Sequence, residues 1–167
     1  FQADPFFQTP PHYAKTGRKL TTFLCPSDQR SEEVYGVSPL QFAFTDYLGV
    51  AGTNRLRLDG VLYVDSKVRL VDIGDGTSST LMVGERPPSA DLKLGWWYAG
   101  WGQGKDGSVE YLMGVRERND HPRYPECGPG PFYFKSPGYE DICGIFHYWS
   151  FHSGGAHFLF ALSLIHI

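Results

Sequence analysis

An oxygen-rich turn is the first place where this 167-residue chain offers ligands for chemistry. The stretch "DIGDGTSSTLMVGE" brings together, within a few positions, Asp72, Asp75, Thr77 and Ser78. Hard cations such as Ca²⁺ favour oxygen-rich loops, and Gly76 permits a sharp bend that turns carbonyl groups inward, although the spacing is not that of an EF-hand. The alternative is an Asx turn, in which Asp75 accepts hydrogen bonds from the backbone N–H groups of Thr77 and Ser78. The pattern favours this turn and leaves Ca²⁺ as the candidate cofactor.

A lone carboxylate follows this turn. Glu85 ends the apolar run "TLMVGE" and precedes Arg86. We expect it to form a structural ion pair with a buried arginine, Arg69 or Arg86. General acid–base catalysis would need a second titratable group in the same cleft. The sequence identifies no such group.

Three histidines, His147, His152 and His157, recur at spacings of five. On adjacent strands of a hairpin, they and Cys143 would offer the nitrogen and sulfur ligands that Zn²⁺ prefers. The spacing is not that of a known zinc motif. The sequence therefore favours a simpler role, in which His152 bonds to backbone in a glycine-containing turn.

Aromatic residues gather in "GWWYAGWGQG", which supplies Trp96, Trp97, Tyr98 and Trp101. Exposed aromatic rings can stack on a sugar or a peptide, whereas buried rings belong to a core or an interface. Packing in a core or an interface is the more common role. Exposure of these rings would instead make them a stripe that binds a ligand.

The cysteines leave two possibilities open. Cys127 and Cys143 flank the loop "CGPGPFYFKSPGYEDIC". A disulfide would close a loop of about 17 residues and add roughly 3 kcal/mol by restricting the unfolded chain. It would also imply an oxidising compartment. Buried free thiols fit the sequence equally well, and Cys25, after "TTFL", is expected to be buried.

Several classes of site are missing from the sequence. It contains no G-x-S-x-G elbow and no glycine-rich phosphate loop. Cys25 is followed by Pro26 rather than by a helix N-terminus that would stabilise a thiolate. The net charge of −3 gives no electrostatic basis for binding nucleic acid or an anionic membrane. We therefore expect a non-catalytic protein with no nucleic-acid partner.

Short strands must position these residues, because 20 Gly and 12 Pro interrupt long helices. Apolar patterns predict strands over 20–25, 42–54, 60–73, 80–85, 144–151 and 156–161. The last two are expected to pair as a hairpin through "HSGG". The sequence therefore predicts one α+β domain, mainly an antiparallel sheet. Its predicted core comprises Phe23, Leu24, Tyr47, Val61, Tyr63, Leu70, Leu81, Val83, Trp97, Phe146, Trp149, Phe158 and Phe160.

The order of the longer segments resembles a known family. "TFLCPSD", "DYLGVAGT", "GVLYVDSKVRLVDIGDGTSSTLMVGERPP", "WWYAG" and "FHYWSFHSGGAHFLFA" follow one another over residues 22–161. They resemble domain-of-unknown-function family 1559, planctomycete-type prepilin-like proteins, whose patterns are close to "D-G-T-S-N-T-L-x-V-G-E" and "H-P-G-G-A-N-F-L-F-A-D-G-S-V-R-F-L". Ser79 stands where Asn is common and Ser153 where Pro is. His157 replaces an Asn, so any role of that Asn does not carry over.

The resemblance implies an architecture more than a reaction. Family members usually begin with a prepilin cleavage and methylation segment and a long hydrophobic helix, as in type IV pilins and type II secretion pseudopilins. It therefore implies a pseudopilin-like domain on the periplasmic or extracellular side of the cell envelope. Its partners would be other pilin-like subunits and, through an N-terminal helix preceding this chain, the inner membrane. By fold-level analogy with pseudopilins that bind Ca²⁺, the turn at Asp72 and Asp75 would be its metal site.

The ends of the chain depart from the family pattern. Residues 1–20 are polar and Pro-rich and are expected to be a linker remnant, and residues 21–161 form the predicted domain. Family members continue after "FLFA" with a turn and a last strand, but residues 162–167 read "LSLIHI". The same six residues are encoded by a DNA string that resembles a sequencing-library adapter. We expect a non-native tail on a metagenomic fragment that lacks its last strand; a genuine apolar strand is the alternative.

Two functions follow from these observations. The first is a structural, pseudopilin-like component of a type II secretion or surface-fibre system. The alternative is a cell-surface module that binds a glycan or peptide through the stripe from Trp96 to Trp101.

Overall fold

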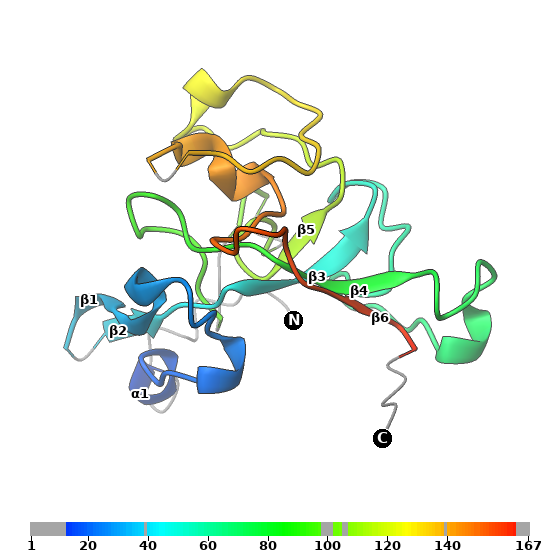
Figure 1. The fold of residues 1–167 in the computed structure, drawn as a ribbon, viewed down its shortest axis with the longest axis horizontal. Coiled ribbons are helices and arrows are strands. Elements are labelled where there is room, and N and C mark those ends of the chain that lie inside the picture. The colour runs from blue at the N-terminus through cyan, green and yellow to red at the C-terminus, as the bar shows by residue number, and fades with distance from the viewer. Residues whose placement is uncertain (1–12, 39, 98–101, 105–106, 139, 163–167) are drawn as a thin grey trace.

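The structure, a computed structural model, describes residues 13–38, 40–97, 102–104, 107–138 and 140–162 (Figure 1). The strands are β1 (Val34–Val37), β2 (Leu40–Ala43), β3 (Tyr47–Gly52), β4 (Leu81–Glu85), β5 (Leu112–Gly114) and β6 (Phe158–Phe160). Within the described residues, the helices are α1 (Tyr13–Thr16) and the 3₁₀ turns η2 (Thr21–Phe23), η3 (Gln29–Glu32), η4 (Leu70–Asp72), η5 (Pro125–Cys127) and η6 (Ile142–Phe146). Among the described residues, no helix has the length and apolarity needed to cross a membrane.

A four-stranded sheet in the order β5-β3-β4-β6 forms the centre of the molecule. β4 pairs antiparallel with both β3 and β6, whereas β3 and β5 run parallel. β1 and β2 form a separate antiparallel pair. The predicted β-rich α+β fold is therefore confirmed.

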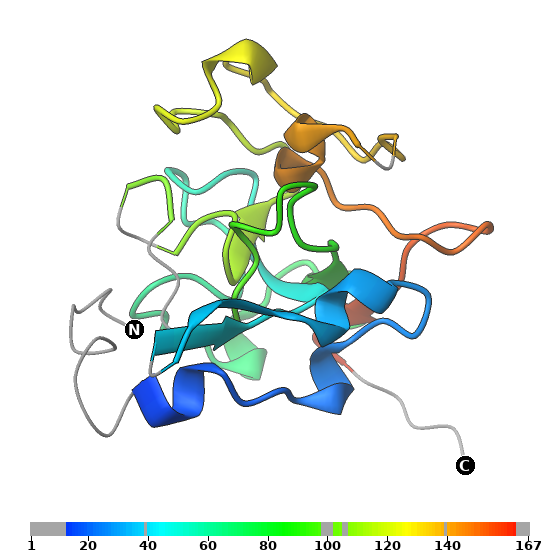
Figure 2. The ribbon, with the colours of Figure 1, turned by 90° about the vertical axis from the view of Figure 1, so that its left-hand side faces the viewer.

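One side of this sheet is covered by an irregular layer, which we call the covering segment (residues 124–138 and 140–148). Both ribbon views show it, coloured yellow to orange, on the side of the sheet opposite the blue N-terminal segment (Figures 1 and 2). The core between the layers comprises Leu48, Val50, Leu94, Val109, Met113, Tyr124, Phe132, Ile145, Phe146 and Tyr148. Because the covering segment has little regular structure, its apolar side chains must hold it against the sheet.

The strand predicted at 80–85 is confirmed as β4, but the one predicted over 42–54 is divided. Around Thr45 the strand ladder is interrupted, and β2 and β3 belong to different sheets. The Thr45 hydroxyl donates to the carbonyl of Tyr47 at 2.9 Å and accepts from its N–H at 3.1 Å. Such local side-chain bonds compete with a ladder and break it.

The strands predicted over 60–73 are absent, and that prediction is wrong. These residues form turns and η4. The Ser66 hydroxyl donates to the carbonyl of Val61 at 2.7 Å, and the Asp72 carboxylate accepts from the Arg69 N–H at 3.0 Å. Polar side chains here satisfy nearby backbone groups, so alternation of apolar and polar residues did not mean a strand.

The predicted hairpin of 144–151 with 156–161 is also wrong. The first segment begins as η6, and β6 pairs with β4 instead. The Trp149 N–H donates to the carbonyl of Glu85 at 3.0 Å, so the end of β4 orders both segments. Residues 20–25, predicted as a strand end, contain the 3₁₀ turn η2.

The predicted core is only partly correct. Phe146 and Trp149 are buried, but Leu70 exposes 57% of its surface and Phe160 exposes 40%. Leu70 lies in η4, at the periphery, and Phe160 lies on the edge strand β6. An apolar side chain in a short element at the rim has no second layer to cover it.

Candidate functional site

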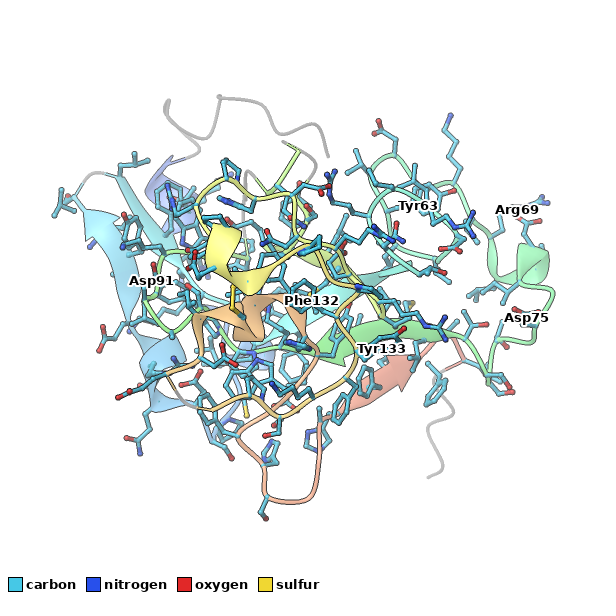
Figure 3. The ribbon with its side chains drawn as sticks, turned by 90° about the horizontal axis from the view of Figure 1, so that it is seen from above. Tyr63, Arg69, Asp75, Asp91, Phe132 and Tyr133 are labelled. Carbon is cyan, nitrogen blue, oxygen red and sulfur yellow. A yellow bond between two sulfur atoms is a disulfide. The ribbon has the colours of Figure 1, made fainter. Side chains whose placement is uncertain are left out.

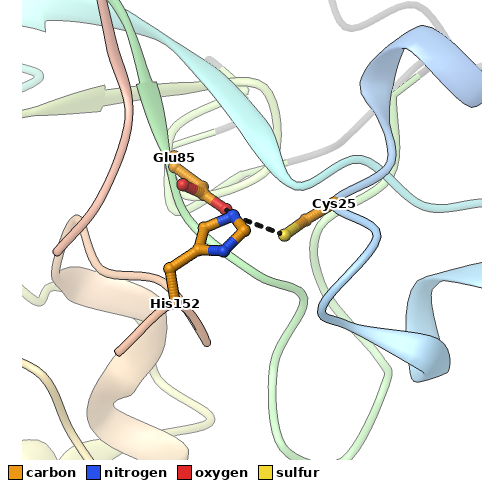
Figure 4. Close-up of side chains that lie close together, drawn as sticks. All are labelled: Cys25, Glu85 and His152. Atoms are coloured by element: carbon orange, nitrogen blue, oxygen red, sulfur yellow. Dashed lines mark hydrogen bonds and ion pairs between the residues drawn. The ribbon is translucent and has the colours of Figure 1, made fainter. Parts of the chain in front are cut away.

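Three side chains from distant parts of the chain converge at the end of β4. Sγ of Cys25 lies 3.3 Å from Nε2 of His152, and Nε2 lies 3.5 Å from Oε1 of Glu85. One potential ligand atom from each residue lies within 4.8 Å of the other two (Figure 4). We call this group the Cys–Glu–His cluster. Its residues come from the loop after η2, the last position of β4 and the turn before β6.

Strand pairing fixes the position of Glu85. Tyr47 of β3 lies opposite Glu85, and the Glu85 N–H donates to the carbonyl of His157 at 3.0 Å. Gly84 allows this close approach, because a Cβ there would lie 2.6 Å from the Tyr148 ring and 2.7 Å from the Phe158 ring. The Glu85 side chain is fully buried as a result.

Asp46 brings Cys25 to the same place. One carboxylate oxygen of Asp46 accepts from the Cys25 N–H at 2.6 Å, and the Asp46 N–H donates to the carbonyl of Phe23 at 2.8 Å. Asp46 directly precedes β3, whose first residue lies opposite Glu85. The loop carrying Cys25 is thus fixed relative to the end of β4.

His152 is oriented from two sides. Its N–H donates to the Ser150 hydroxyl at 3.0 Å, and its Nδ1 lies 3.1 Å from the Ser27 hydroxyl. The contact at Nδ1 leaves Nε2 directed at Cys25 and Glu85. The His152 side chain is 30% exposed, so this side of the cluster faces solvent.

The two carboxylate oxygens of Glu85 have different surroundings. Oε2 accepts from the His157 N–H at 2.9 Å and lies 3.0 Å from Nδ1 of the same residue. Oε1 is buried and makes no hydrogen bond of normal geometry. Burial raises the pKa of Glu85, but neighbouring donors, Cys25 first and then His157 and Ser150, outweigh burial and lower it. The cluster therefore contains a buried carboxylate ion.

The geometry does not suit a cysteine nucleophile. A Cys–His–acid triad needs the thiol at one imidazole nitrogen and the acid at the other. Here both Cys25 and Glu85 approach Nε2 of His152, and Nδ1 of His152 contacts the Ser27 hydroxyl. Burial, followed by hydrogen bonding to Glu85, raises the pKa of the Cys25 thiol to about 11. The thiol is protonated at neutral pH.

Several sequence-based pairings differ from this arrangement. Glu85 does not pair with Arg69, which binds Asp72, or with Arg86, whose guanidinium donates to the carbonyls of Pro87 and Val109. Successive side chains of a strand point to opposite faces, which separates Glu85 from Arg86. The prediction of a Glu85–Arg pair is therefore wrong.

Two of the three histidines do come together. The rings of His152 and His157 lie 4.7 Å apart, between centroids. His147 lies elsewhere, with Nδ1 at 2.5 Å from the carbonyl of Tyr133 in the covering segment. Cys143 is bonded to Cys127 in a disulfide, with an S–S distance of 2.01 Å, so it offers no thiolate. The sulfur near the histidines belongs to Cys25, far away in the sequence.

The oxygen-rich turn lies at one end of the molecule. Figure 3 shows Arg69 and Asp75 at the edge, away from Phe132 in the covering segment. Both carboxylate oxygens of Asp72 accept from the Arg69 guanidinium, at 2.9 and 2.7 Å. The Thr77 carbonyl accepts from the Leu162 N–H at 3.0 Å, while Asp75 and Ser78 are exposed. Asp72 thus already forms an ion pair with Arg69.

The aromatic stripe is divided between two cavities. Trp96 stacks on Phe42 with ring centroids 4.1 Å apart and lines a cavity of about 500 Å³. Trp97 lines a different cavity of about 210 Å³, and its indole N–H donates to the carbonyl of Arg18 at 2.8 Å. Tyr98 and Trp101 lie outside the described residues.

The larger cavity holds a carboxylate that sequence reasoning missed. Glu110 is buried, and its Oε2 accepts from the N–H groups of Gly95 at 2.7 Å and Trp96 at 3.2 Å. Burial raises the pKa of Glu110 to about 7. Nothing in the local sequence around Glu110, "GSVEYLM", distinguishes it from a surface glutamate.

Comparison with known proteins gives one match. The family model described as "Protein of unknown function (DUF1559)" matches residues 2–161. No curated protein and no solved structure matches the chain.

Proposed function

The chain belongs to the DUF1559 family, and from this premise we propose that it is a non-catalytic, pseudopilin-like structural component of a type II secretion or surface-fibre system. The proposal places the domain on the outer side of a membrane, in contact with other pilin-like subunits and anchored by a helix preceding this chain.

The Cys127–Cys143 disulfide is the observation that carries the proposed location. It lies in the covering segment, where Cys127 and Ile142 pack against the core. Disulfides persist in oxidising compartments such as the periplasm and are rare in the cytosol. A cross-link that secures one layer of the core supports folding outside the cytoplasm.

The edge strand β6 is available for pairing with a further strand. Among the described residues, β6 pairs only with β4. Leu159 and Phe160 are each 40% exposed on this edge. Exposed strand edges with apolar side chains pair readily with another chain. This edge can therefore accept a strand, either from the rest of the same protein or from another subunit, and the cross-linking test below distinguishes the two.

The test uses the reading frame that contains this chain, expressed with and without a prepilin peptidase. We expect peptidase-dependent shortening, recovery in the envelope fraction, and cross-linking between copies carrying Leu159→Cys. Val37→Cys, on the exposed strand β1, is the matched control and should cross-link less. Recovery in the cytoplasm without processing would overturn the proposal.

A second candidate function rests on the cavity beside Trp96. Apolar and basic side chains both reach it, including Phe42, Trp96, Lys93 and Arg123. Aromatic floors with basic rims bind sugars or peptides that carry negative charge. Because the Glu110 carboxylate lines the same cavity, we keep a glycan or peptide as the ligand class of this alternative, with Lys93 and Arg123 placed to contact acidic groups on it.

Tryptophan fluorescence tests this alternative. Titration with acidic polysaccharides should change the emission of the wild type but not of Trp96→Phe. Trp97→Phe, which alters the other cavity, should respond like the wild type. Equal responses of all three proteins would remove the hypothesis.

A further inference from the structure

We propose that the Cys–Glu–His cluster is a mononuclear zinc site, in which Sγ of Cys25, Oε1 of Glu85 and Nε2 of His152 bind the ion. The inference does not depend on the proposed pseudopilin-like role. It concerns a site that lies apart from both the oxygen-rich turn and the cavity beside Trp96.

The distances fit tetrahedral coordination. With ordinary zinc bond lengths, two tetrahedral ligands are separated by about 3.5 Å for sulfur and nitrogen and about 3.4 Å for nitrogen and oxygen. The observed separations are 3.3 Å between Cys25 and His152 and 3.5 Å between His152 and Glu85. The sulfur and the carboxylate oxygen lie within 4.8 Å of each other, against about 3.6 Å for tetrahedral zinc, so side-chain movements of about 1 Å at most would bring all three ligands to one ion.

Each ligand residue already uses its other polar atoms. Nδ1 of His152 contacts the Ser27 hydroxyl, and Oε2 of Glu85 is bonded to His157. The backbone of Cys25 is held by Asp46. Metal sites depend on such outer contacts to fix the tautomer and direction of each ligand. The contacts leave one ligand atom from each residue directed at a common point.

One buried oxygen of the cluster lacks a well-formed hydrogen bond. Glu85 is fully buried, yet Oε1 makes no hydrogen bond of normal geometry. Nε2 of His152 lies 3.5 Å from this oxygen, and a buried oxygen that lacks a good hydrogen bond costs about 1–3 kcal/mol. A zinc ion would satisfy this oxygen.

Charge and ligand type favour zinc over calcium. Sulfur and imidazole ligands are soft or borderline, and calcium prefers oxygen alone. When the ion binds, the Cys25 thiol loses its proton to solvent and the thiolate binds the metal. Thiolate and carboxylate together then neutralise Zn²⁺. The exposed side of His152 leaves room for a water molecule as the fourth ligand.

The experiment is a Co²⁺ titration of the full, metal-free chain under non-reducing conditions, followed by displacement with Zn²⁺. We expect one Co²⁺ per chain, a thiolate-to-cobalt charge-transfer band and the visible bands of tetrahedral Co²⁺. Because Cys127 and Cys143 are joined in a disulfide, a thiolate band can arise only from Cys25. One proton should be released per ion from the thiol.

Variants assign the ligands. Cys25→Ser should abolish the charge-transfer band, and both Cys25→Ser and Glu85→Gln should weaken Zn²⁺ binding by at least ~100-fold. His121→Ala is the matched control and should bind like the wild type, because its imidazole accepts from the Arg123 N–H and is not among the cluster's ligands. If Cys25→Ser does not fold, the wild-type spectrum decides alone. No thiolate band at saturating Co²⁺, or an unchanged band in Cys25→Ser, would overturn the proposal.

Discussion

The Cys–Glu–His cluster and the oxygen-rich turn both collect groups that could bind a cation, but their construction differs. The turn takes its side chains from one short stretch at the edge of the molecule, and Arg69 and Asp72 bind one another there. The cluster joins residues as far as 127 positions apart, with Glu85 fully buried. Polar side chains that are close in the sequence can form hydrogen bonds with one another. Side chains that are brought together by tertiary packing can be held where they do not form such bonds.

The largest expected difference between the two regions is in stability. Glu85→Ala should lower the free energy of unfolding by about 3 kcal/mol, because it removes a fully buried carboxylate and leaves the His157 N–H without its acceptor. Asp75→Ala, in the exposed turn, should leave it unchanged within error. Urea unfolding of both variants in the presence of a chelator makes the comparison. Equal losses would show that the two regions are equally integral to the fold.

Glu110 is a second buried carboxylate, and it allows the effect of burial on a pKa to be compared with the effect of hydrogen-bond donors at Glu85. The pKa of Glu110 is raised to about 7 in the folded state. As pH rises, Glu110 therefore loses its proton at a lower pH in the unfolded chain than in the folded protein. Stability should therefore fall between pH 5 and 8, by on the order of 2 kcal/mol, and Glu110→Gln should flatten this decline.

Glu85 should behave in the opposite way. Its pKa is lowered, so its contribution is present above the unfolded pKa and is lost as pH falls through the folded value. Glu85→Gln should flatten the acid side of the stability profile. Unfolding measured from pH 3 to 8 checks both slopes, and identical profiles for the two Gln variants would contradict the assignment.

The smallest effect is expected in the turn itself. Asp72→Asn breaks an exposed ion pair with Arg69, and exposed pairs contribute little. We expect no measurable change in the unfolding midpoint at low or high salt.

Calorimetry with Ca²⁺ should give the same result for the wild type and Asp75→Ala. Binding heat lost only in Asp75→Ala would establish a calcium site in the turn.

Sequence patterns predicted the features that depend on neighbouring residues. The continuous apolar run before Glu85 indicated β4, and the Gly and Pro content indicated a β-rich fold with short helices. The ordered motifs indicated the family, which is confirmed. Patterns failed where other groups took over the hydrogen bonds. Over 60–73 these were nearby side chains such as Ser66, and at the expected hairpin it was β4, which paired with β6.

The sequence by itself determined which groups were available: a cysteine after "TTFL", a glutamate at a strand end and a histidine in a turn. Only the tertiary structure determined that they meet. The β3–β4 register, the Asp46 contact with Cys25 and the bond from Trp149 to Glu85 together bring them within reach. These contacts link distant segments, and their geometry depends on how whole layers pack, which no local spacing of residues encodes.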